Sequence, residues 1–335
     1  MMKILSKVYL ISVFVLLLSV LVFSSSAFAQ LEMYGMASGG PGGVYYHHAS
    51  GFAQYIEEKL PDIRITVDVS AGSVENVRRV DRKEAHFGLA FIYNAYEAFK
   101  GMEEWGWEKE YSNIRGIAMY LWPETNWVTL KQKNIESIED LKGKKMSLGP
   151  PGSGSAVIAE RMLKALNVFN DIIPSYLPFA DAAAALKDGQ IDVFVGPGGY
   201  PAASLTEVAT THDMVLISLT NEELDKCLKE LPGSVKGVVP AGAYRGLEQP
   251  VQQSVSPSLV IVHKDVPEES VYKIVSNFFT EEGLDYAGDI HQDWKRVIPV
   301  DQRVLEGMVI PLHPGAAKYW EELGLEIPEQ AKPID

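Results

Sequence analysis

Residue types that would define a chemistry are scarce in this sequence. Cys227 is the only cysteine among 335 residues, so no disulfide can form within the chain. Its surroundings, EELDKCLKELP, have the apolar spacing of a helix and predict a structural thiol rather than a reactive one. Bases are also in deficit, with 30 Lys and Arg against 44 Asp and Glu and a formal net charge of −14. Such an acidic chain disfavours nucleic acid and anionic lipid as partners.

Common catalytic motifs are missing as well. The sequence has no H-E-x-x-H, no G-x-S-x-G and no G-x-G-x-x-G. GPPGSGSAV has the glycine spacing of a phosphate loop, but Ser155 and Ala156 replace the Lys and Ser/Thr that phosphate and Mg²⁺ require. His47 and His48 are neighbours, and neighbours on a helix point about 100° apart, which is poor geometry for a shared metal. We therefore expect no catalysis, no cofactor and no metal, and we interpret the histidine pair as a feature of the surface or of a pocket wall.

The beginning of the chain predicts export. Lys3 and Lys7 precede an apolar run over residues 8–23, and Ala-Phe-Ala follows and ends at Ala29. This order is typical of a secretory signal peptide, residues 1–29, and a retained membrane anchor is the alternative. Loss of the two lysines would take the formal charge from −14 to −16, because this segment holds no acids. We expect a mature protein that diffuses freely in the periplasm as a monomer.

The remaining chain repeats one order of elements. LEMYGMASGGPGGVYYHHASGFAQYIEEKL predicts a strand, a Gly-rich loop and a helix, and IRITVDVSAGSVENVRRV with EAHFGLAFI continues the alternation. The order recurs in KKMSLGPPGSGSAVIAERMLKAL, IIPSYLPFADAAAALKDGQ and IDVFVGPGGYP. Short strands alternating with helices predict parallel sheets covered on both faces, and the chain length suits two such α/β lobes.

Two extended segments are expected to cross between the lobes. The first covers residues 125–131, and the second covers residues 256–266 after LPGSVKGVVPAGAYRGLEQP, which we interpret as irregular. The first lobe then comprises residues 30–124 and 257–335, and the second comprises residues 125–256. The predicted fold is therefore α/β, with two lobes joined at a hinge of two crossing strands.

Each Gly-rich loop leads from a strand into a helix, where open α/β sheets bind ligands. Backbone N–H groups at a helix N-terminus hold an anion without a basic side chain. From the first lobe, the candidate ligand-binding residues are Gly43, Val44, Tyr45, Ser73, Val74, Asn76 and Tyr93. From the second lobe, they are Ser153, Gly154, Ser155, Phe179, Gly198 and Tyr200. Tight turns, aromatic core and N-caps, at Ser73 and Asp181 for example, are the alternative roles of these residues.

Several segments together resemble one protein family. GGPGGVYY, AGSVENVRRV, SIEDLKGKKMSLGPPGSGSAV, ALKDGQIDVFV, GGYP and PLHPGAAKYW are similar to the TAXI class of substrate-binding proteins of TRAP transporters. GGVYY followed by GSVEN is the specific part. The resemblance implies a two-lobed periplasmic binding protein of type II, a Venus flytrap. Such a receptor would hand a small carboxylate, such as glutamate, glutamine or 2-oxoglutarate, to a sodium-driven permease with fused or separate small and large subunits.

Two segments depart from the family pattern near the expected cleft. They are Ile92-Tyr93-Asn94 and His47-His48-Ala49. A ligand that differs within the small organic anions is the inference from these departures. The alternatives to a TRAP receptor are a binding protein of an ABC-type importer and a secreted enzyme that uses the same cleft.

Overall fold

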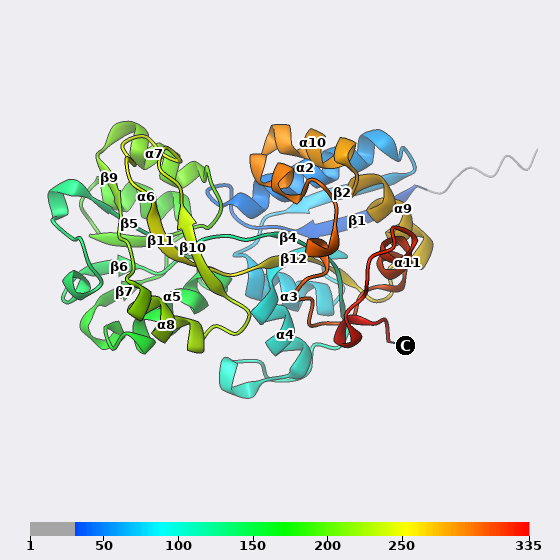
Figure 1. Ribbon diagram of the computed structural model, residues 1–335, viewed down its shortest axis with the longest axis horizontal. Helices are drawn as coiled ribbons and strands as arrows, with labels where there is room; N and C mark the ends of the chain where they lie inside the picture. Colours follow the sequence, from blue (N-terminus) through cyan, green and yellow to red (C-terminus); the bar gives the residue numbers. More distant parts are fainter. Residues whose placement is uncertain (1–30, 335) are drawn as a thin grey trace, which may run out of the picture.

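The computed structural model describes residues 31–334, so the predicted signal peptide, residues 1–29, lies outside the described residues. The described chain forms two lobes side by side, linked by extended segments that run between them (Figure 1). Each lobe has its own five-stranded sheet. Across residues 31–334, no helix has the length and apolar character that a membrane crossing requires.

The first lobe has the strand order β2-β1-β3-β12-β4. Its strands are β1 (Glu32–Ala37), β2 (Ile63–Asp68), β3 (Phe87–Phe91), β4 (Ile114–Leu121) and β12 (Ser258–His263). Its helices are α2 (Val44–Lys59), α3 (Ser73–Asp81), α4 (Ile92–Lys100), α9 (Glu268–Phe278), α10 (Glu281–Ile290) and α11 (Pro314–Glu322). The last three helices lie beside α2, β1 and β4, so the end of the chain returns to this lobe (Figure 1).

The second lobe has the equivalent order β7-β6-β8-β5-β9. Its strands are β5 (Asn126–Leu130), β6 (Lys145–Ser147), β7 (Ile173–Ser175), β8 (Val193–Gly196) and β9 (Met214–Leu216). Its helices are α5 (Gly154–Ala165), α6 (Phe179–Lys187), α7 (Ala203–Thr211) and α8 (Asn221–Lys229). Short 3₁₀ helices are η1 (Glu103–Trp105), η2 (Lys131–Lys133), η3 (Glu139–Leu141), η4 (Phe169–Asp171), η5 (Gln292–Val297), η6 (Gln302–Val304) and η7 (Glu329–Ala331).

Both sheets are mixed, and the prediction of wholly parallel sheets was wrong. β1, β2 and β3 are parallel, as are β6, β7 and β8. β12 runs antiparallel to β3 and β4, and β5 runs antiparallel to β8 and β9. β12 and β5 each begin just after the chain has crossed from the other lobe. They start beside the carboxyl ends of the parallel strands. They therefore run in the opposite direction.

A segment predicted to be irregular contains a strand. β10 (Val235–Val239) pairs antiparallel with β11 (Val251–Val255) as a separate two-stranded sheet. Only Val239 of β10 is buried, so the strand lacks the apolar alternation by which sequence patterns reveal strands. The nearby glycines and prolines, which favour turns, concealed it further.

The two crossing segments lie against each other at the hinge. The backbone N–H of Thr125 donates to the carbonyl oxygen of Ser254 at 2.9 Å, and that of Ser256 donates to the carbonyl oxygen of Pro123 at 3.0 Å. β4 thus leads into β5 beside the return of β11 into β12. Because residues 31–334 pass from one five-stranded sheet to the other only in these two segments, we propose lobes that comprise residues 30–124 with 257–335 and residues 125–256.

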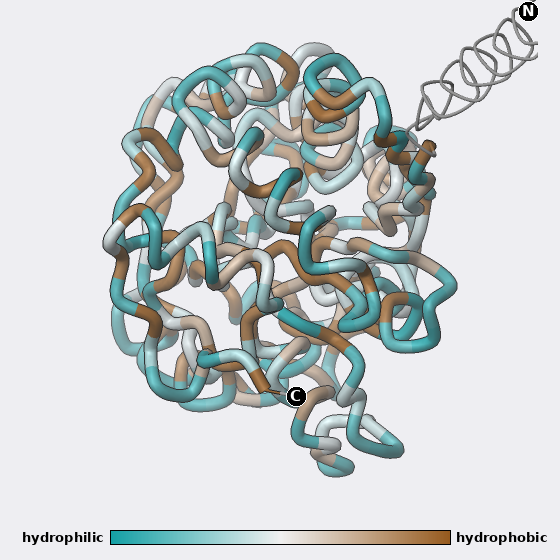
Figure 2. Tube along the Cα trace, turned by 90° about the vertical axis from the view of Figure 1, so that its right-hand side faces the viewer, coloured by the Kyte–Doolittle hydropathy of each residue, from teal (hydrophilic) through white to brown (hydrophobic). Residues whose placement is uncertain are grey.

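Apolar side chains fill the space on both sides of each sheet. Phe52, Phe278 and Trp294 are fully buried in the first lobe, and Trp127 is fully buried in the second. Figure 2 shows hydrophobic segments crossing the middle of the molecule, with hydrophilic segments frequent on the outer turns. Cys227 is buried in α8, and burial raises the pKa of its thiol to about 12. The prediction of a structural thiol is confirmed.

Candidate functional site

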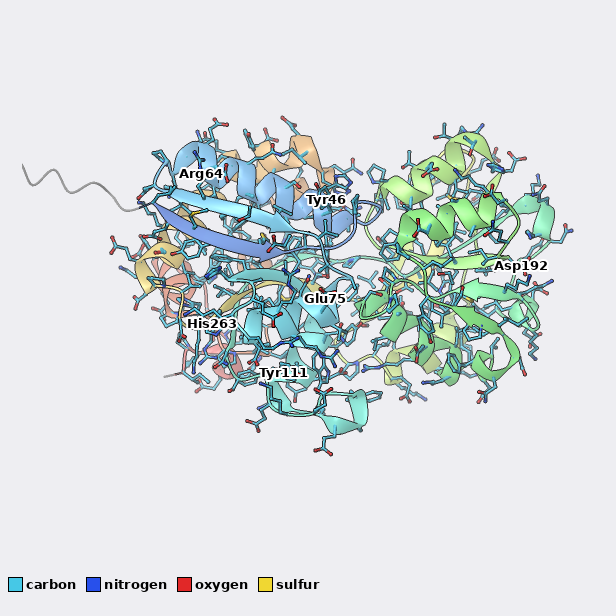
Figure 3. All side chains as sticks on the ribbon, turned by 180° about the vertical axis from the view of Figure 1, so that it is seen from behind. Tyr46, Arg64, Glu75, Tyr111, Asp192 and His263 are labelled. Atoms are coloured by element: carbon cyan, nitrogen blue, oxygen red, sulfur yellow. The ribbon has the colours of Figure 1, made fainter. Side chains whose placement is uncertain are left out.

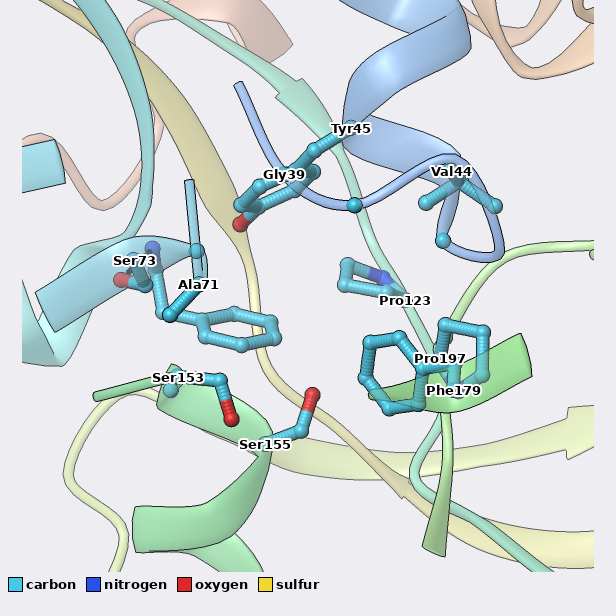
Figure 4. Close-up of a pocket in the computed structure, with 16 residues that line it drawn as sticks. Gly39, Val44, Tyr45, Ala71, Ser73, Pro123, Ser153, Ser155, Phe179 and Pro197 are labelled. Carbon is cyan, nitrogen blue, oxygen red and sulfur yellow. Dashed lines mark hydrogen bonds between the residues drawn. The ribbon is translucent and has the colours of Figure 1, made fainter. Parts of the chain in front are cut away.

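A small cavity lies where the Gly-rich loops of the two lobes face each other (Figure 4). Its volume of about 40 Å³ has room for about three water molecules. The first lobe and the first hinge segment line it with Gly39, Gly40, Gly43, Val44, Tyr45, Ala71, Gly72, Ser73, Phe91 and Pro123. The second lobe lines it with Ser153, Gly154, Ser155, Phe179, Pro197 and Gly198.

Four helices begin at this cavity. The N-cap residues Gly43 of α2, Gly72 of α3 and Ser153 of α5 line it, as does Phe179, the first residue of α6. Helix N-termini present backbone N–H groups without intrahelical partners and carry a partial positive charge. The lining residues include no Asp, Glu, His, Lys or Arg. Backbone dipoles and hydroxyl groups are therefore the groups with which the cavity walls can bind an anion.

Glycine permits the two lobes to approach each other here. A Cβ atom on Gly154 would lie 2.3 Å from Cδ2 of Phe91 and 2.7 Å from Oδ1 of Asn94, both in the first lobe. Gly72, which precedes α3, has a φ of 122°, a backbone conformation that favours glycine. These two positions explain why small residues are needed where α3 and α5 begin.

Two of the predicted site serines use their hydroxyl groups to hold the protein's own loops. Ser73 Oγ accepts from the backbone N–H of Phe91 at 2.9 Å and donates to Oδ1 of Asn94 at 2.8 Å. Ser153 Oγ donates to the carbonyl oxygen of Pro150 at 2.7 Å and accepts from the N–H of Ala156 at 3.1 Å, which caps α5. Both hydroxyl groups are therefore occupied.

The N-cap predictions at Ser73 and Asp181 were wrong. Ser73 is the first residue of α3, and its hydroxyl group bridges to the end of β3 instead of capping the helix. Asp181 lies in the first turn of α6, whose N-cap is Pro178. In both cases the helix begins earlier than the sequence pattern indicates.

On the second-lobe side of the cavity, Ser155 has a hydroxyl group that is available to a ligand. Figure 4 shows its side chain directed into the space between the two lobes. Within residues 31–334, Ser155 Oγ makes no hydrogen bond to protein, in contrast to Ser73 and Ser153. Tyr45 faces it from the first lobe, and its phenol oxygen lies 2.7 Å from Oγ of Ser258. Burial raises the pKa of Tyr45, so this phenol stays neutral.

Nine of the thirteen predicted residues line the cavity, and four lie elsewhere. Val74 is buried in the core of the first lobe. Tyr93 is buried in α4, where its hydroxyl group donates to the carbonyl oxygen of Gly154 at 3.0 Å across the lobe boundary. Tyr200 is partly buried against Arg296, whose guanidinium carbon lies 3.9 Å from the ring centroid. Neither tyrosine lines the cavity, although both were predicted to contact the ligand.

Asn76, the fourth of these residues, holds the loops behind the cavity. Its amide nitrogen donates to the carbonyl oxygens of Ser38 and Leu89, both at 2.7 Å. Its Oδ1 accepts from the hydroxyl group of Ser70 at 2.6 Å. The side chain is fully buried and fully hydrogen-bonded, so it holds the loops after β1 and β2 against β3 and is not among the residues that line the cavity.

The sequence reasoning missed several lining residues. Gly39, Gly40, Ala71 and Gly72 belong to loops that it singled out, but the individual positions could not be selected. Phe91 is the last residue of β3, and its place at the carboxyl end of a parallel strand was an available signal. Pro197 directly follows β8 and had the same signal, whereas Pro123 gave none, because a proline before an extended segment indicates a structural break.

Three contacts join the lobes beside the cavity. Arg161 on α5 forms a two-pronged ion pair with Glu97 on α4, with N–O distances of 2.7 and 2.9 Å, and both side chains are buried. The N–H of Glu75 donates to the carbonyl oxygen of Gly152 at 3.2 Å. Figure 3 shows Glu75 between His263 in the first lobe and Asp192 in the second. With the bond from Tyr93, these contacts hold the two lobes together.

A buried acid lies in the hinge itself. Glu124 forms an isolated β-bridge with Val255 and is 6% exposed. Burial raises the pKa of its carboxyl group to about 7, despite the opposing effect of Arg296. Its Oε2 atom has no hydrogen-bond partner in the described part of the chain. The hinge therefore contains a carboxyl group whose charge changes near neutral pH.

Comparison with known proteins agrees with this architecture. A protein described as a periplasmic transporter is 12% identical and has a TM-score of 0.52, with coverage of 80% of this chain and 96% of its own. An ancestral arginine-binding protein bound to arginine is 14% identical, with a TM-score of 0.51 and coverage of 78% and 97%. A protein from Bordetella bronchiseptica RB50 is 15% identical, with a TM-score of 0.51 and coverage of 90% and 91%.

These likenesses confirm the predicted fold, a two-lobed α/β periplasmic binding protein. The family model of the NMT1-like family matches residues 36–324, which is most of the chain. The fold is shared with a protein described as a periplasmic transporter and with an arginine-binding protein. The chain belongs to the NMT1-like family.

Proposed function

We propose that the protein captures a small organic carboxylate in the cavity between its lobes and delivers it to a membrane permease from the periplasm. The observation that carries this proposal is the meeting of four helix N-termini at a cavity without charged side chains. A carboxylate placed there would accept hydrogen bonds from backbone N–H groups and from Ser155. The charge of a single carboxylate needs neither a metal nor a lysine.

The size of the cavity restricts the ligand. A volume of about 40 Å³ accommodates only a few heavy-atom centres in this arrangement of the lobes. A compact acid of a few carbon atoms fits it directly. Glutamate, glutamine or 2-oxoglutarate, the ligands that the resemblance to TAXI proteins implies, would require the lobes to stand farther apart.

Binding without turnover is the favoured activity. The lining residues offer no carboxylate, imidazole, amine or thiol as a general base or nucleophile, and burial raises the pKa of the Tyr45 phenol. Closure of the lobes over the ligand would then be the signal that a permease recognises. An enzyme would require a reactive group that this cavity does not contain.

The membrane partner is the finer part of the proposal. The motifs GGVYY and GSVEN favour a TRAP permease with small and large subunits. The two-lobed fold is equally suited to a receptor of an ATP-driven importer. Reconstitution of the purified protein with each class of permease in vesicles would separate the two, because only the cognate permease would give uptake of the bound acid.

Calorimetric titration with a panel of acids tests the binding proposal. The panel should run from acetate, lactate and pyruvate to succinate, 2-oxoglutarate, glutamate and glutamine. We expect one compact acid to bind one-to-one and to bind more weakly to the Ser155→Ala variant. Failure of every acid to bind would contradict the carboxylate proposal, and equal affinity of the variant would remove Ser155 from the site.

A further inference from the structure

Three metal-ligating side chains meet behind the cavity wall near Val44, since a Cβ atom on Gly199 would lie 2.5 Å from Oδ2 of Asp293 and 3.4 Å from Cγ1 of Val44. His48 lies on α2, His291 lies between α10 and η5, and Asp293 lies in η5. Nε2 of His48 is 3.0 Å from Nδ1 of His291 and 3.5 Å from Oδ2 of Asp293. Nδ1 of His291 is 3.4 Å from the same Oδ2. Two nitrogens and one oxygen thus form a nearly equilateral triangle.

The dimensions of this triangle match a tetrahedral metal site. Ligand atoms bound to zinc at about 2.0 Å in tetrahedral geometry lie roughly 3.3 Å from one another. The three observed separations, from 3.0 to 3.5 Å, lie around that value. An ion placed above the plane of the three atoms would reach all of them with little movement of the side chains.

The three groups are buried and incompletely paired. His48 and Asp293 are 0% exposed, and His291 is 7% exposed. Neither carboxylate oxygen of Asp293 has a hydrogen-bond partner within residues 31–334, although Nη1 of Arg296 lies 3.3 Å from Oδ1. A buried carboxylate without hydrogen bonds is costly, and a bound cation would compensate that cost at Oδ2.

The hydrogen bonds of His291 fix its tautomer, and its Nδ1 accepts from the Nε2–H of His48 at 3.0 Å, so a metal would take the place of that proton. The backbone N–H of Asp293 points at Nδ1 of His291 at 3.4 Å, so Nδ1 is the unprotonated nitrogen. Nε2 then carries the proton and donates to the carbonyl oxygen of Pro201 at 3.1 Å. A ligating histidine commonly donates its other ring N–H to a backbone carbonyl in this way, which fixes the orientation of the ring.

We propose that His48, His291 and Asp293 bind a divalent transition-metal ion, with zinc as the preferred ion. Two imidazole nitrogens favour zinc over Mg²⁺ or Ca²⁺, which take oxygen ligands. Three protein ligands leave the fourth tetrahedral position to water. The proposal replaces the expectation of no metal, because the partner of His48 is a histidine 243 positions away rather than the adjacent His47.

The ion would stiffen a connection between the lobes. Nε2 of His291 donates to the carbonyl oxygen of Pro201. The side-chain amide Nε2 of Gln292 donates to the carbonyl oxygen of Tyr200 at 2.6 Å. Both carbonyl groups belong to the second-lobe loop that begins at the cavity with Pro197 and Gly198. A surface groove between α7 and α10 reaches His291 and Pro201, and it gives an ion a path to the site.

Cobalt and zinc binding to the chelator-treated, redialysed protein tests the proposal. We expect one Co²⁺ per chain with the intense visible bands of tetrahedral coordination, displacement of Co²⁺ by Zn²⁺, and a higher melting temperature with Zn²⁺. Asp293→Asn should weaken metal binding more than about 100-fold. Mutation of a residue that only hydrogen-bonds to a metal ligand already costs about 10- to 100-fold in affinity. His47→Gln is the matched control, because it removes the neighbouring imidazole and should retain both the bands and the affinity.

Two outcomes would overturn the proposal. One is a wild-type protein that takes up neither Co²⁺ nor Zn²⁺ in stoichiometric amount, a result that does not depend on the folding of any variant. The other is equal metal binding by the wild type, Asp293→Asn and His48→Gln, with circular dichroism showing that the variants are folded. The carboxylate titration is carried out separately with chelator present, so failure of the metal site and failure of the proposed function are distinguishable.

Discussion

Ser153 and Ser155 stand two positions apart at the start of α5 and have different roles. Ser153 is the N-cap and already donates its hydroxyl proton to Pro150, whereas Ser155 directs an unused hydroxyl group into the cavity (Figure 4). The sequence predicts both as ligand contacts because a Gly-Ser loop has the same composition in either role. Only the three-dimensional course of the loop separates a cap from a contact.

Replacement of each serine by alanine should therefore affect a different property of the protein. Ser155→Ala should weaken binding of the acid roughly 10-fold or more, because a hydrogen bond to a charged group is lost, and should leave stability unchanged. Ser153→Ala should lower the free energy of unfolding by about 1 kcal/mol, because α5 loses its cap. Calorimetry and urea unfolding of both variants provide the measurements. A stable Ser153→Ala protein with weakened binding and an unaffected Ser155→Ala protein would reverse the assignment.

Glu124 makes the stability of the hinge depend on pH. The pKa of its carboxyl group is about 7 in the folded protein, above the ordinary value of 4.5. The stability that it contributes is thus fully present below about pH 4.5 and is lost as the pH rises through 7. The loss is on the order of 3 kcal/mol at most.

The Glu124→Gln variant should not lose this stability as the pH rises, because glutamine cannot ionise. We expect the free energy of unfolding of the variant to exceed that of the wild type by more at pH 8 than at pH 5. Urea unfolding of both proteins with chelator present measures this difference. Glu222→Gln, at an exposed acid on α8, should show no such pH-dependent difference. A difference between Glu124→Gln and the wild type that is the same at both pH values would contradict the buried, titrating carboxyl group.

At the scale of elements, α4 and α5 link the lobes through one buried ion pair. Glu97 and Arg161 are on different lobes, and the guanidinium carbon of Arg161 also lies 3.9 Å from the ring centroid of Trp105. Separation of the lobes exposes both charges to water, so the pair is formed only in the closed arrangement. It therefore adds to closure rather than to the stability of either lobe.

Glu97→Gln should shift the protein toward open forms, because Arg161 would be left buried without its counter-charge. We expect at least about 10-fold weaker binding of the acid, with little change in the unfolding of each lobe. Small-angle X-ray scattering should show a larger radius of gyration for the variant than for the wild type. Glu222→Gln serves as the control, since its ion pair with Lys226 lies within α8. A variant as compact and as tight-binding as the wild type would show that this pair does not contribute to closure.

The elements themselves were largely predictable, for identifiable reasons. β1 and β8 are short apolar runs before Gly-rich loops, and α3 and α5 follow small-residue loops, so pattern and position agree. β10 was not predictable, because four of its five residues are not buried and its sequence lacks an apolar face. The antiparallel direction of β5 and β12 depends on where the chain re-enters each sheet, which no local pattern records.

At the scale of the whole molecule, residues distant in sequence generate the properties that the sequence could not reveal. Phe91 and Gly154 meet because the lobes close, and His48 meets His291 because α10 packs on α2. Four helix N-termini from two lobes form one anion-binding cavity, although each loop alone reads as an ordinary turn. Loop composition therefore predicted the region of the site, whereas closure determines which side chains reach it.

Native mass spectrometry of the freshly purified protein tests the central claim most directly. The proposed function predicts a chain that carries the added mass of one small organic acid, released when the protein is unfolded and regained after refolding with that acid. A chain that has only its bare mass on purification, and that gains no adduct from any acid of the panel, would contradict a carboxylate receptor.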